Sequence, residues 1–132
     1  MLCVKPCTDI EFKEQVLSTL GYNADSAELL TAEENGRLLG YAAVKQLGQN
    51  LEILRLSIMS CTDYSSPTEE DSEIAEYLVR AAANYAYNRM LTTLSCSLPE
   101  FSTILLRLGF DKVDNLCEIN IKKLFNSCKN CK

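Results

Sequence analysis

SPTEEDSEIAEYLVRAAANYAYNRMLTTLSCSL, residues 66–98, is the stretch that decides the fold. Ser66, a following proline and Glu69 predict a helix start, because they form a capping box with proline at the first helical position. Apolar side chains then recur at helical spacing, at Ile74, Leu78, Ala82 and Tyr85. We expect one helix of about 24 residues that ends near Met90. The β-compatible run Leu91–Leu98 predicts a buried strand directly after it.

Length and composition favour one soluble domain. The chain has 132 residues, of which 47% are hydrophobic and 23% are charged, and this is enough for a single core. We expect a single domain over residues 1–126 and a Cys/Lys-rich tail over residues 127–132. No apolar run approaches the ~18 residues of a membrane span, and the first residues lack the apolar region of a signal peptide. We therefore expect a cytoplasmic protein without a membrane partner.

Charge and the absence of histidine exclude several function classes. The net charge of −5 disfavours nucleic acid as a partner, because phosphate binding needs a basic face. Six acids lie between Asp63 and Glu76, without a basic residue among them. The chain contains no histidine, which excludes Ser-His and Cys-His nucleophile pairs, histidine metal ligands and the commonest general base.

Seven cysteines are many for a cytosolic chain, but their odd number and scattered positions do not suggest a disulfide framework. Cys128 and Cys131 have the spacing of half a zinc site, and Cys3 and Cys7 could supply the other half. Only one of these pairs is close and convincing, and histidine is missing, so we expect no bound metal. A zinc site joining the two ends of the chain stays open as the alternative.

The remaining elements follow from caps, turns and periodicity. In chain order they are a short edge strand at Leu2–Val4, a helix capped by Thr8 and ended by Gly21, strands at Ala27–Glu33 and Arg37–Leu47 joined by an Asn35-Gly36 turn, a central strand at Leu51–Met59, the long helix and its strand, a short helix ended by Gly109, and a closing hairpin at Val113 and Leu116–Ile121. These elements predict an α/β (α+β) class with a mostly antiparallel sheet. A right-handed crossover through the long helix should place Leu51–Met59 beside Leu91–Leu98 in parallel.

Two motifs in this order resemble the GNAT superfamily of N-acetyltransferases. They are YLVRAAANYAYNRM at 77–90 and LLRLGF at 105–110, and the resemblance covers roughly residues 27–121. It implies a GNAT-like mixed sheet flanked by helices, in which the parallel fourth and fifth strands part and acetyl-CoA lies between them. The fourth strand would contribute the backbone of Leu56 and Ile58. The pyrophosphate would sit at the N-terminus of the long helix, where N–H groups and the helix dipole favour an anion.

The phosphate-binding loop of that family, Q/R-x-x-G-x-G/A, falls on Glu70, Glu73 and Ala75. Only Ala75 fits, because Glu70 replaces a polar or basic residue and Glu73 replaces a glycine that lets phosphate approach the backbone. We expect N–H donors at Ser72 to Ala75. Each close carboxylate would repel a phosphate by ~1–4 kcal/mol, and such acids also stabilise a helix start by themselves. Acetyl-CoA should therefore bind weakly.

The catalytic residues are equally incomplete. Many relatives carry a tyrosine as general acid four residues before the glycine of the Leu-Gly-Phe motif, where this chain has Leu105. Tyr64 could replace it if its loop folds over the cleft. Glu52 is the candidate base that deprotonates an amine, and its alternative role is a solvated charge on a strand. Two functions stay open: an N-acyltransferase acting on a small-molecule or peptide amine, and a non-catalytic GNAT-fold binding or interaction protein that has lost the cofactor.

Overall fold

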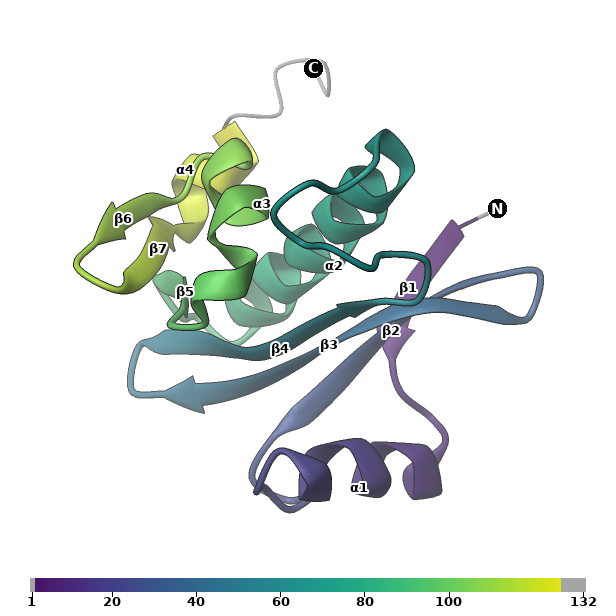
Figure 1. Cartoon of the computed structure of the whole chain (residues 1–132). Helices are drawn as coiled ribbons and strands as arrows, with labels where there is room; N and C mark the ends of the chain where they lie inside the picture. Colours follow the sequence, from purple (N-terminus) through teal and green to yellow (C-terminus); the bar gives the residue numbers. More distant parts are fainter. Residues whose placement is uncertain (1, 127–132) are drawn as a thin grey trace.

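The structure of this chain, a computed structural model, describes residues 2–126 and places seven strands of that range in one mixed sheet (Figure 1). The strands are β1 (Leu2–Pro6), β2 (Glu28–Glu34), β3 (Arg37–Leu47), β4 (Asn50–Ile58), β5 (Thr93–Cys96), β6 (Asp111–Val113) and β7 (Leu116–Asn120). The helices are α1 (Ile10–Thr19), α2 (Glu69–Asn88), the 3₁₀ turn η1 (Pro99–Phe101), α3 (Ser102–Arg107) and α4 (Ile121–Asn126).

The sheet has the order β1-β2-β3-β4-β5-β7-β6. Neighbouring strands are antiparallel except β4 and β5, which are parallel. The long helix α2 crosses from one of these two strands to the other, so the predicted parallel pair and the predicted class are confirmed. No helix within residues 2–126 is both long and apolar enough to cross a lipid bilayer.

The two faces of the sheet are covered by different helices. Figure 1 shows α2, α3 and α4 on one face and α1 alone on the other. The main core lies under α2, whose buried face includes Ile74, Leu78 and the small residues Ala75, Ala82, Ala83 and Ala86. The small side chains let the helix lie close to the sheet. Gly40 of β3 contributes to this close packing, because a Cβ there would lie 3.4 Å from Leu78 Cδ1 of α2 and only 2.5 Å from the carbonyl oxygen of Ser57 on β4.

The predicted start of the long helix at Ser66 is wrong. α2 is capped by Thr68, whose Oγ1 accepts a hydrogen bond from the N–H of Asp71 at 3.1 Å. The Asp71 carboxylate in turn accepts one from the N–H of Thr68 at 3.3 Å, which completes a capping box. Asp71 also accepts a hydrogen bond from the hydroxyl of Ser60 at 2.6 Å. A partner outside the helix therefore selects the later of two acceptable capping boxes.

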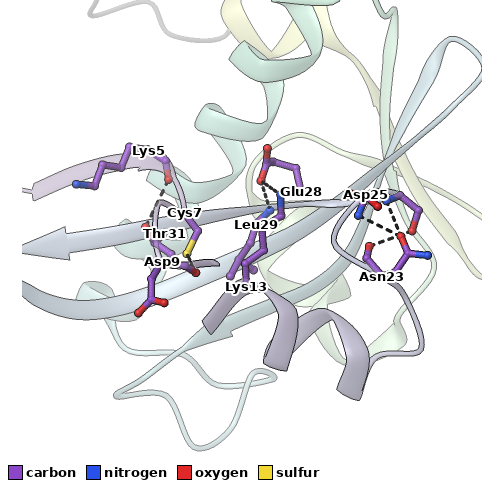
Figure 2. A network of polar contacts seen from close by, with 10 residues as sticks. Lys5, Cys7, Asp9, Lys13, Asn23, Asp25, Glu28, Leu29 and Thr31 are labelled. Carbon is purple, nitrogen blue, oxygen red and sulfur yellow. Dashed lines mark hydrogen bonds and ion pairs between the residues drawn. The ribbon is translucent and has the colours of Figure 1, made fainter. Parts of the chain in front are cut away.

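The cap of α1 is also shifted, by one residue. Asp9, not Thr8, caps this helix and accepts a hydrogen bond from the N–H of Phe12 at 3.2 Å. Figure 2 shows the polar contacts that fix α1 beside β2, among them the ion pair between Lys13 Nζ and Glu28 Oε1 at 3.0 Å. Beneath these contacts lies a second apolar cluster centred on the buried side chains Leu17, Leu29 and Ala43.

The strand that follows α2 is shorter than Leu91–Leu98. Leu91 lies in the turn that ends α2, because its N–H donates to the carbonyl oxygen of Ala86 at 3.0 Å. β5 covers only Thr93–Cys96, and Leu98 precedes η1. The strand is therefore shorter than the run of β-compatible residues, because a turn at the end of α2 precedes it and the 3₁₀ turn η1 follows it. Hydrophobicity alone does not predict these two turns.

Candidate functional site

β4 and β5 run side by side for only three residue pairs and then part. The pairs are Asn50–Thr93, Leu51–Leu94 and Glu52–Ser95. β4 continues to Ile58, and its register with β3 shifts between Ala43 and Val44, so that Leu54 is the extra residue of a β-bulge. We call the region bounded by Ile53–Ile58 of β4 and by residues 97–101 after β5 the β4–β5 fork.

Two aromatic side chains of the chain itself meet at this fork. The N–H of Ile58 donates a hydrogen bond to Tyr64 Oη at 3.0 Å. The Tyr64 ring lies edge-on to Phe101 of η1, with ring centroids 4.9 Å apart and an interplanar angle of 70°. Phe101 is fully buried, and the guanidinium of Arg55 on β4 lies 5.7 Å from its ring centroid. Phe101 therefore links β4 to the segment after β5, and Tyr64 covers the end of β4.

The loop that carries Tyr64 also satisfies the other backbone group of Ile58, whose carbonyl oxygen accepts a hydrogen bond from the N–H of Cys61 at 3.0 Å. Ser65 and Asp63 close the tip of the loop through a hydroxyl–carboxylate bond of 2.6 Å. Both polar groups of the last β4 residue are therefore bonded within the chain. A ligand that approached this backbone would have to replace those bonds.

The N-terminus of α2 has few donors left for an anion. Four N–H groups at a helix start lack a partner within the helix. Two of them are already bonded within the capping box: Thr68 donates to the Asp71 carboxylate at 3.3 Å and Asp71 donates to Thr68 Oγ1 at 3.1 Å. Ser72 makes the first intrahelical bond, to the carbonyl oxygen of Thr68 at 2.9 Å. At most two, those of Glu69 and Glu70, remain for a ligand. The predicted donors at Ser72 to Ala75 are therefore wrong, because α2 starts at Glu69 and uses them internally.

The carboxylate of Asp71 already supplies the negative charge that a helix N-terminus favours. Its side chain is only 3% exposed. Burial raises the pKa of this carboxyl, but hydrogen bonds from the Ser60 hydroxyl and the Thr68 backbone outweigh that effect, so the pKa lies below its ordinary value. Asp71 is therefore ionised at neutral pH and stands where an anionic ligand would gain most from the dipole.

The space beside this helix start is also acidic. A cavity of about 210 Å³ lies between α2 and α3 and is lined by Glu69, Glu73, Glu76 and Arg107, among others. Glu76 is paired within α2 to Arg80 at 2.9 Å. The three carboxylates outnumber the one guanidinium, so this cavity favours a cation over a phosphate.

Glu52 lies at the apex of the fork, on the last parallel pair. Its neighbours Leu51 and Ile53 are buried under α2, so alternation places Glu52 on the opposite face of the sheet. Glu52 Oε2 accepts a long hydrogen bond of 3.5 Å from the hydroxyl of Ser97. Asn50 and Ser95 are joined beside it by a bond of 2.8 Å. A partly exposed carboxylate among hydroxyl and amide groups can accept a proton from an amine.

Several solved structures with a similar fold are described as acetyltransferases or a related synthase. A protein of Desulfovibrio desulfuricans described as a GNAT-family acetyltransferase shares 9% identity at a TM-score of 0.64, over 92% of this chain and 99% of that one. The ribosomal-protein-S18-alanine N-acetyltransferase of Escherichia coli shares 11% at a TM-score of 0.65, over 92% and 94%. The N-acetylglutamate synthase of Neisseria gonorrhoeae, solved with coenzyme A and N-acetyl-glutamate, shares 15% at 0.67, over 92% and 35%. This chain has the GNAT fold.

The likeness to these structures is one of fold, since identity is low. No protein-family model matches the sequence, and no curated protein matches it at a significant level. The GNAT fold nevertheless fits the resemblance seen in the sequence. The cofactor-binding positions implied by that resemblance can therefore be compared with the structure at the fork and at the start of α2.

In this conformation those positions do not fit acetyl-CoA. Ile58 is bonded to Tyr64, and Leu56 is a buried residue paired with Ala42 of β3. Ala75 is 0% exposed, in the core beneath α2, whereas Glu70 and Glu73 are exposed at its start. The implied binding residues are therefore either engaged, buried or repulsive to phosphate.

The candidate acid and base lie at the two ends of the fork. Tyr64 meets the end of β4, and Glu52 lies at the apex, six residues earlier on that strand. Leu105, at the place of the tyrosine of many GNAT enzymes, is fully buried. The structure thus brings Tyr64 to the fork, as its catalytic role would require, but engages its oxygen with Ile58.

Sequence reasoning missed the capping role of Asp71, which it counted only among the acids near the helix start, and the role of Phe101. Asp71 completes the pattern Thr-x-x-Asp at 68–71, which is a capping-box signature that could have been found. Phe101 had no such signal, because an apolar residue after a proline is ordinary. The predicted zinc alternative rests partly on Cys128 and Cys131, which lie outside the described residues. Within residues 2–126, no group of three or more His, Cys, Asp or Glu side chains could hold a metal ion.

Proposed function

We propose that this chain is a GNAT-fold binding protein whose acetyl-CoA site is filled by its own side chains. The observation that carries the proposal is the hydrogen bond from the N–H of Ile58 to Tyr64 Oη at 3.0 Å. This bond uses the N–H of Ile58, which the GNAT resemblance predicts would donate a hydrogen bond to the cofactor instead. The edge-on contact of Tyr64 with the buried Phe101 fills the same region with apolar volume.

Simple energetics support weak cofactor binding. Displacing Tyr64 loses one hydrogen bond, ~1 kcal/mol, and one aromatic pair, ~1 kcal/mol. The exposed carboxylates of Glu69, Glu70 and Glu73 add a repulsion of the order of 1 kcal/mol for each one that comes near a phosphate. A total of about 3–4 kcal/mol weakens binding by roughly 150- to 1000-fold. A ligand of micromolar intrinsic affinity would then bind at about 1 mM.

A specific observation also favours the second candidate, an N-acyltransferase acting on a small-molecule or peptide amine. The fork is retained, with a bulge in β4 and the carboxylate of Glu52 at its apex. In this candidate the loop of Tyr64 swings away to admit acetyl-CoA, and Glu52 takes a proton from the amine. Tyr64 accepts its present hydrogen bond through oxygen, so its own proton stays available for donation.

Calorimetric titration with acetyl-CoA separates the two candidates. We expect wild-type protein to bind with a dissociation constant on the order of 1 mM or weaker. Glu70→Arg with Glu73→Gly should tighten binding by roughly tenfold or more, because it removes two repulsions of ~1 kcal/mol each. Adding Tyr64→Ala to that pair should tighten binding by at least a further tenfold, because Tyr64 then no longer has to be displaced. Tyr87→Ala, at an exposed tyrosine near the other end of α2, is the matched control.

Two results would contradict the proposal. Micromolar binding by the wild type would show that displacing the Tyr64 loop costs little free energy, and would support the acyltransferase. Failure of the triple variant to bind better than the wild type would show that Tyr64 and the two acids are not what limits access. Circular dichroism spectra of each variant would establish that it is folded.

A further inference from the structure

A groove outside the fork lies between the first half of α2 and the edge of the sheet. Its volume is about 560 Å³, which is within the range of ligand sites in proteins. It opens over the ends of β1, β2, β3 and β4. Its lining includes Leu2, Leu38, Met59, Glu70, Glu73 and Tyr77. We call it the β1–α2 groove.

Large apolar side chains converge on this groove while remaining open to solvent. Met59 is 51% exposed and Tyr77 is 53% exposed. Leu2 and Leu38 are only partly buried. Single exposed apolar residues are ordinary, but a group of them around one concavity is typical of an interaction surface.

The charged residues of the groove favour a basic partner. Its lining holds three acids and one arginine. Glu70 and Glu73 are exposed and form no ion pair with another described residue. Arg37 is the register neighbour of Glu34 on the adjacent strand. A second copy of this chain carries a net charge of −5, so its approach is opposed by repulsion, whereas a cationic segment is attracted.

β1 forms an edge of the sheet, and no described residue pairs with its outer side. Its second half carries Lys5 and Pro6, which are residue types that protect edges from further pairing. Its first half, Leu2–Val4, has no such protection, and Leu2 lines the groove. A strand added beside this half would direct alternate side chains toward the groove.

We propose that the β1–α2 groove binds a short basic peptide in an extended conformation, by strand addition to β1. A central apolar side chain of the peptide contacts Met59 and Leu2. Arginine or lysine side chains two positions away contact Glu70 and Glu73, and one of them can stack on the Tyr77 ring. The proposal names a partner class for the binding function proposed above. Tyr64 and Phe101 do not line this groove, so each proposal can fail without the other.

The probe for the test is a fluorescein-labelled heptapeptide of sequence SRTLTRS, acetylated and amidated at its ends. Its pattern is symmetric, so it can add to β1 in either direction with arginine, leucine and arginine facing the groove. Fluorescence anisotropy in 150 mM salt should give a dissociation constant on the order of 100 μM. The charge-reversed peptide SETLTES should bind at least tenfold more weakly. Two N-methylated versions of SRTLTRS test strand addition, one methylated at the serine and threonine amides and the other at the arginine and leucine amides. Alternate amides of a strand point to opposite edges, so the version that has lost the N–H groups facing β1 should bind at least fivefold more weakly.

Protein variants locate the site. Glu70→Gln with Glu73→Gln should weaken binding of SRTLTRS at least fivefold. Glu11→Gln with Glu14→Gln is the matched control, since it removes the same charge from exposed positions of α1, and it should change binding less than twofold. Equal loss in both pairs would show general charge attraction and overturn the proposal. Insensitivity to both patterns of N-methylation would exclude strand addition and overturn it as well. A dimer in sedimentation velocity that Glu70→Gln with Glu73→Gln dissociates would assign the groove to a second copy, and would equally refute the peptide.

Discussion

Replacing Tyr64 with phenylalanine removes only the oxygen that accepts the hydrogen bond from Ile58. The bond measures 3.0 Å, and the ring contact with Phe101 at 4.9 Å can persist in the variant. The loss leaves a backbone N–H without an acceptor at the end of β4. Such a group costs ~1–3 kcal/mol, and partial exposure of Tyr64 favours the lower end. We expect Tyr64→Phe to lower the free energy of unfolding by about 1–1.5 kcal/mol, which is a shift in Tm of about 4 °C for a chain of this size.

Two assays check this expectation. Urea unfolding followed by circular dichroism gives the free energy, and amide hydrogen exchange measured by NMR reports the N–H of Ile58 directly. Exchange at Ile58 should be slow in the wild type and markedly faster in Tyr64→Phe. Tyr77→Phe, at a side chain that is 53% exposed, is the control and should change neither value. Unchanged stability together with unchanged exchange at Ile58 would show that Tyr64 does not hold the fork closed in solution.

Three further predictions concern other parts of the fold. Asp71 has a pKa lowered in the folded state, so its stabilisation is fully present above its unfolded pKa near ~3.9. Asp71→Asn should cost ~1–2 kcal/mol at pH 7, and in urea titrations the difference from wild type should shrink as pH falls below that value and through the lowered pKa of the folded state. Gly40→Ala would place a Cβ 2.5 Å from the backbone oxygen of Ser57, so it should destabilise by ~2–3 kcal/mol in thermal unfolding. Burial raises the pKa of Cys96 to about 11, whereas Cys3 is exposed. Iodoacetamide at pH 8 should therefore modify Cys3 before Cys96, as peptide mass spectrometry would show, and should reach Cys96 only after unfolding.

The class of the fold and its central connection were predictable from local pattern. Helical periodicity over Ile74 to Tyr85 and the β-compatible run after it predicted α2, β5 and their crossover. The parallel pairing of Asn50–Glu52 with Thr93–Ser95 then followed, because a strand–helix–strand unit in one sheet is almost always right-handed and parallel. The helix starts were less predictable. Two acceptable capping boxes overlap at the start of α2, and the Ser60 hydroxyl, eleven residues before Asp71, favours the later one.

By itself, the sequence determined which side chains are available: no histidine for catalysis, acids where a GNAT loop would carry glycine or a basic residue, and leucine in place of a catalytic tyrosine. These are properties of residue type and spacing, which need no partner. Only the tertiary structure decided that Tyr64 bonds to Ile58, that Phe101 links β4 to the segment after β5, and that an exposed groove adjoins β1. The reason is physical. The loop before α2 has no periodic pattern that predicts where its side chains point. Its path depends on two tertiary contacts: a hydrogen bond to the end of β4, which no longer pairs with β5, and the hydrogen bond from Ser60 to the capping residue Asp71.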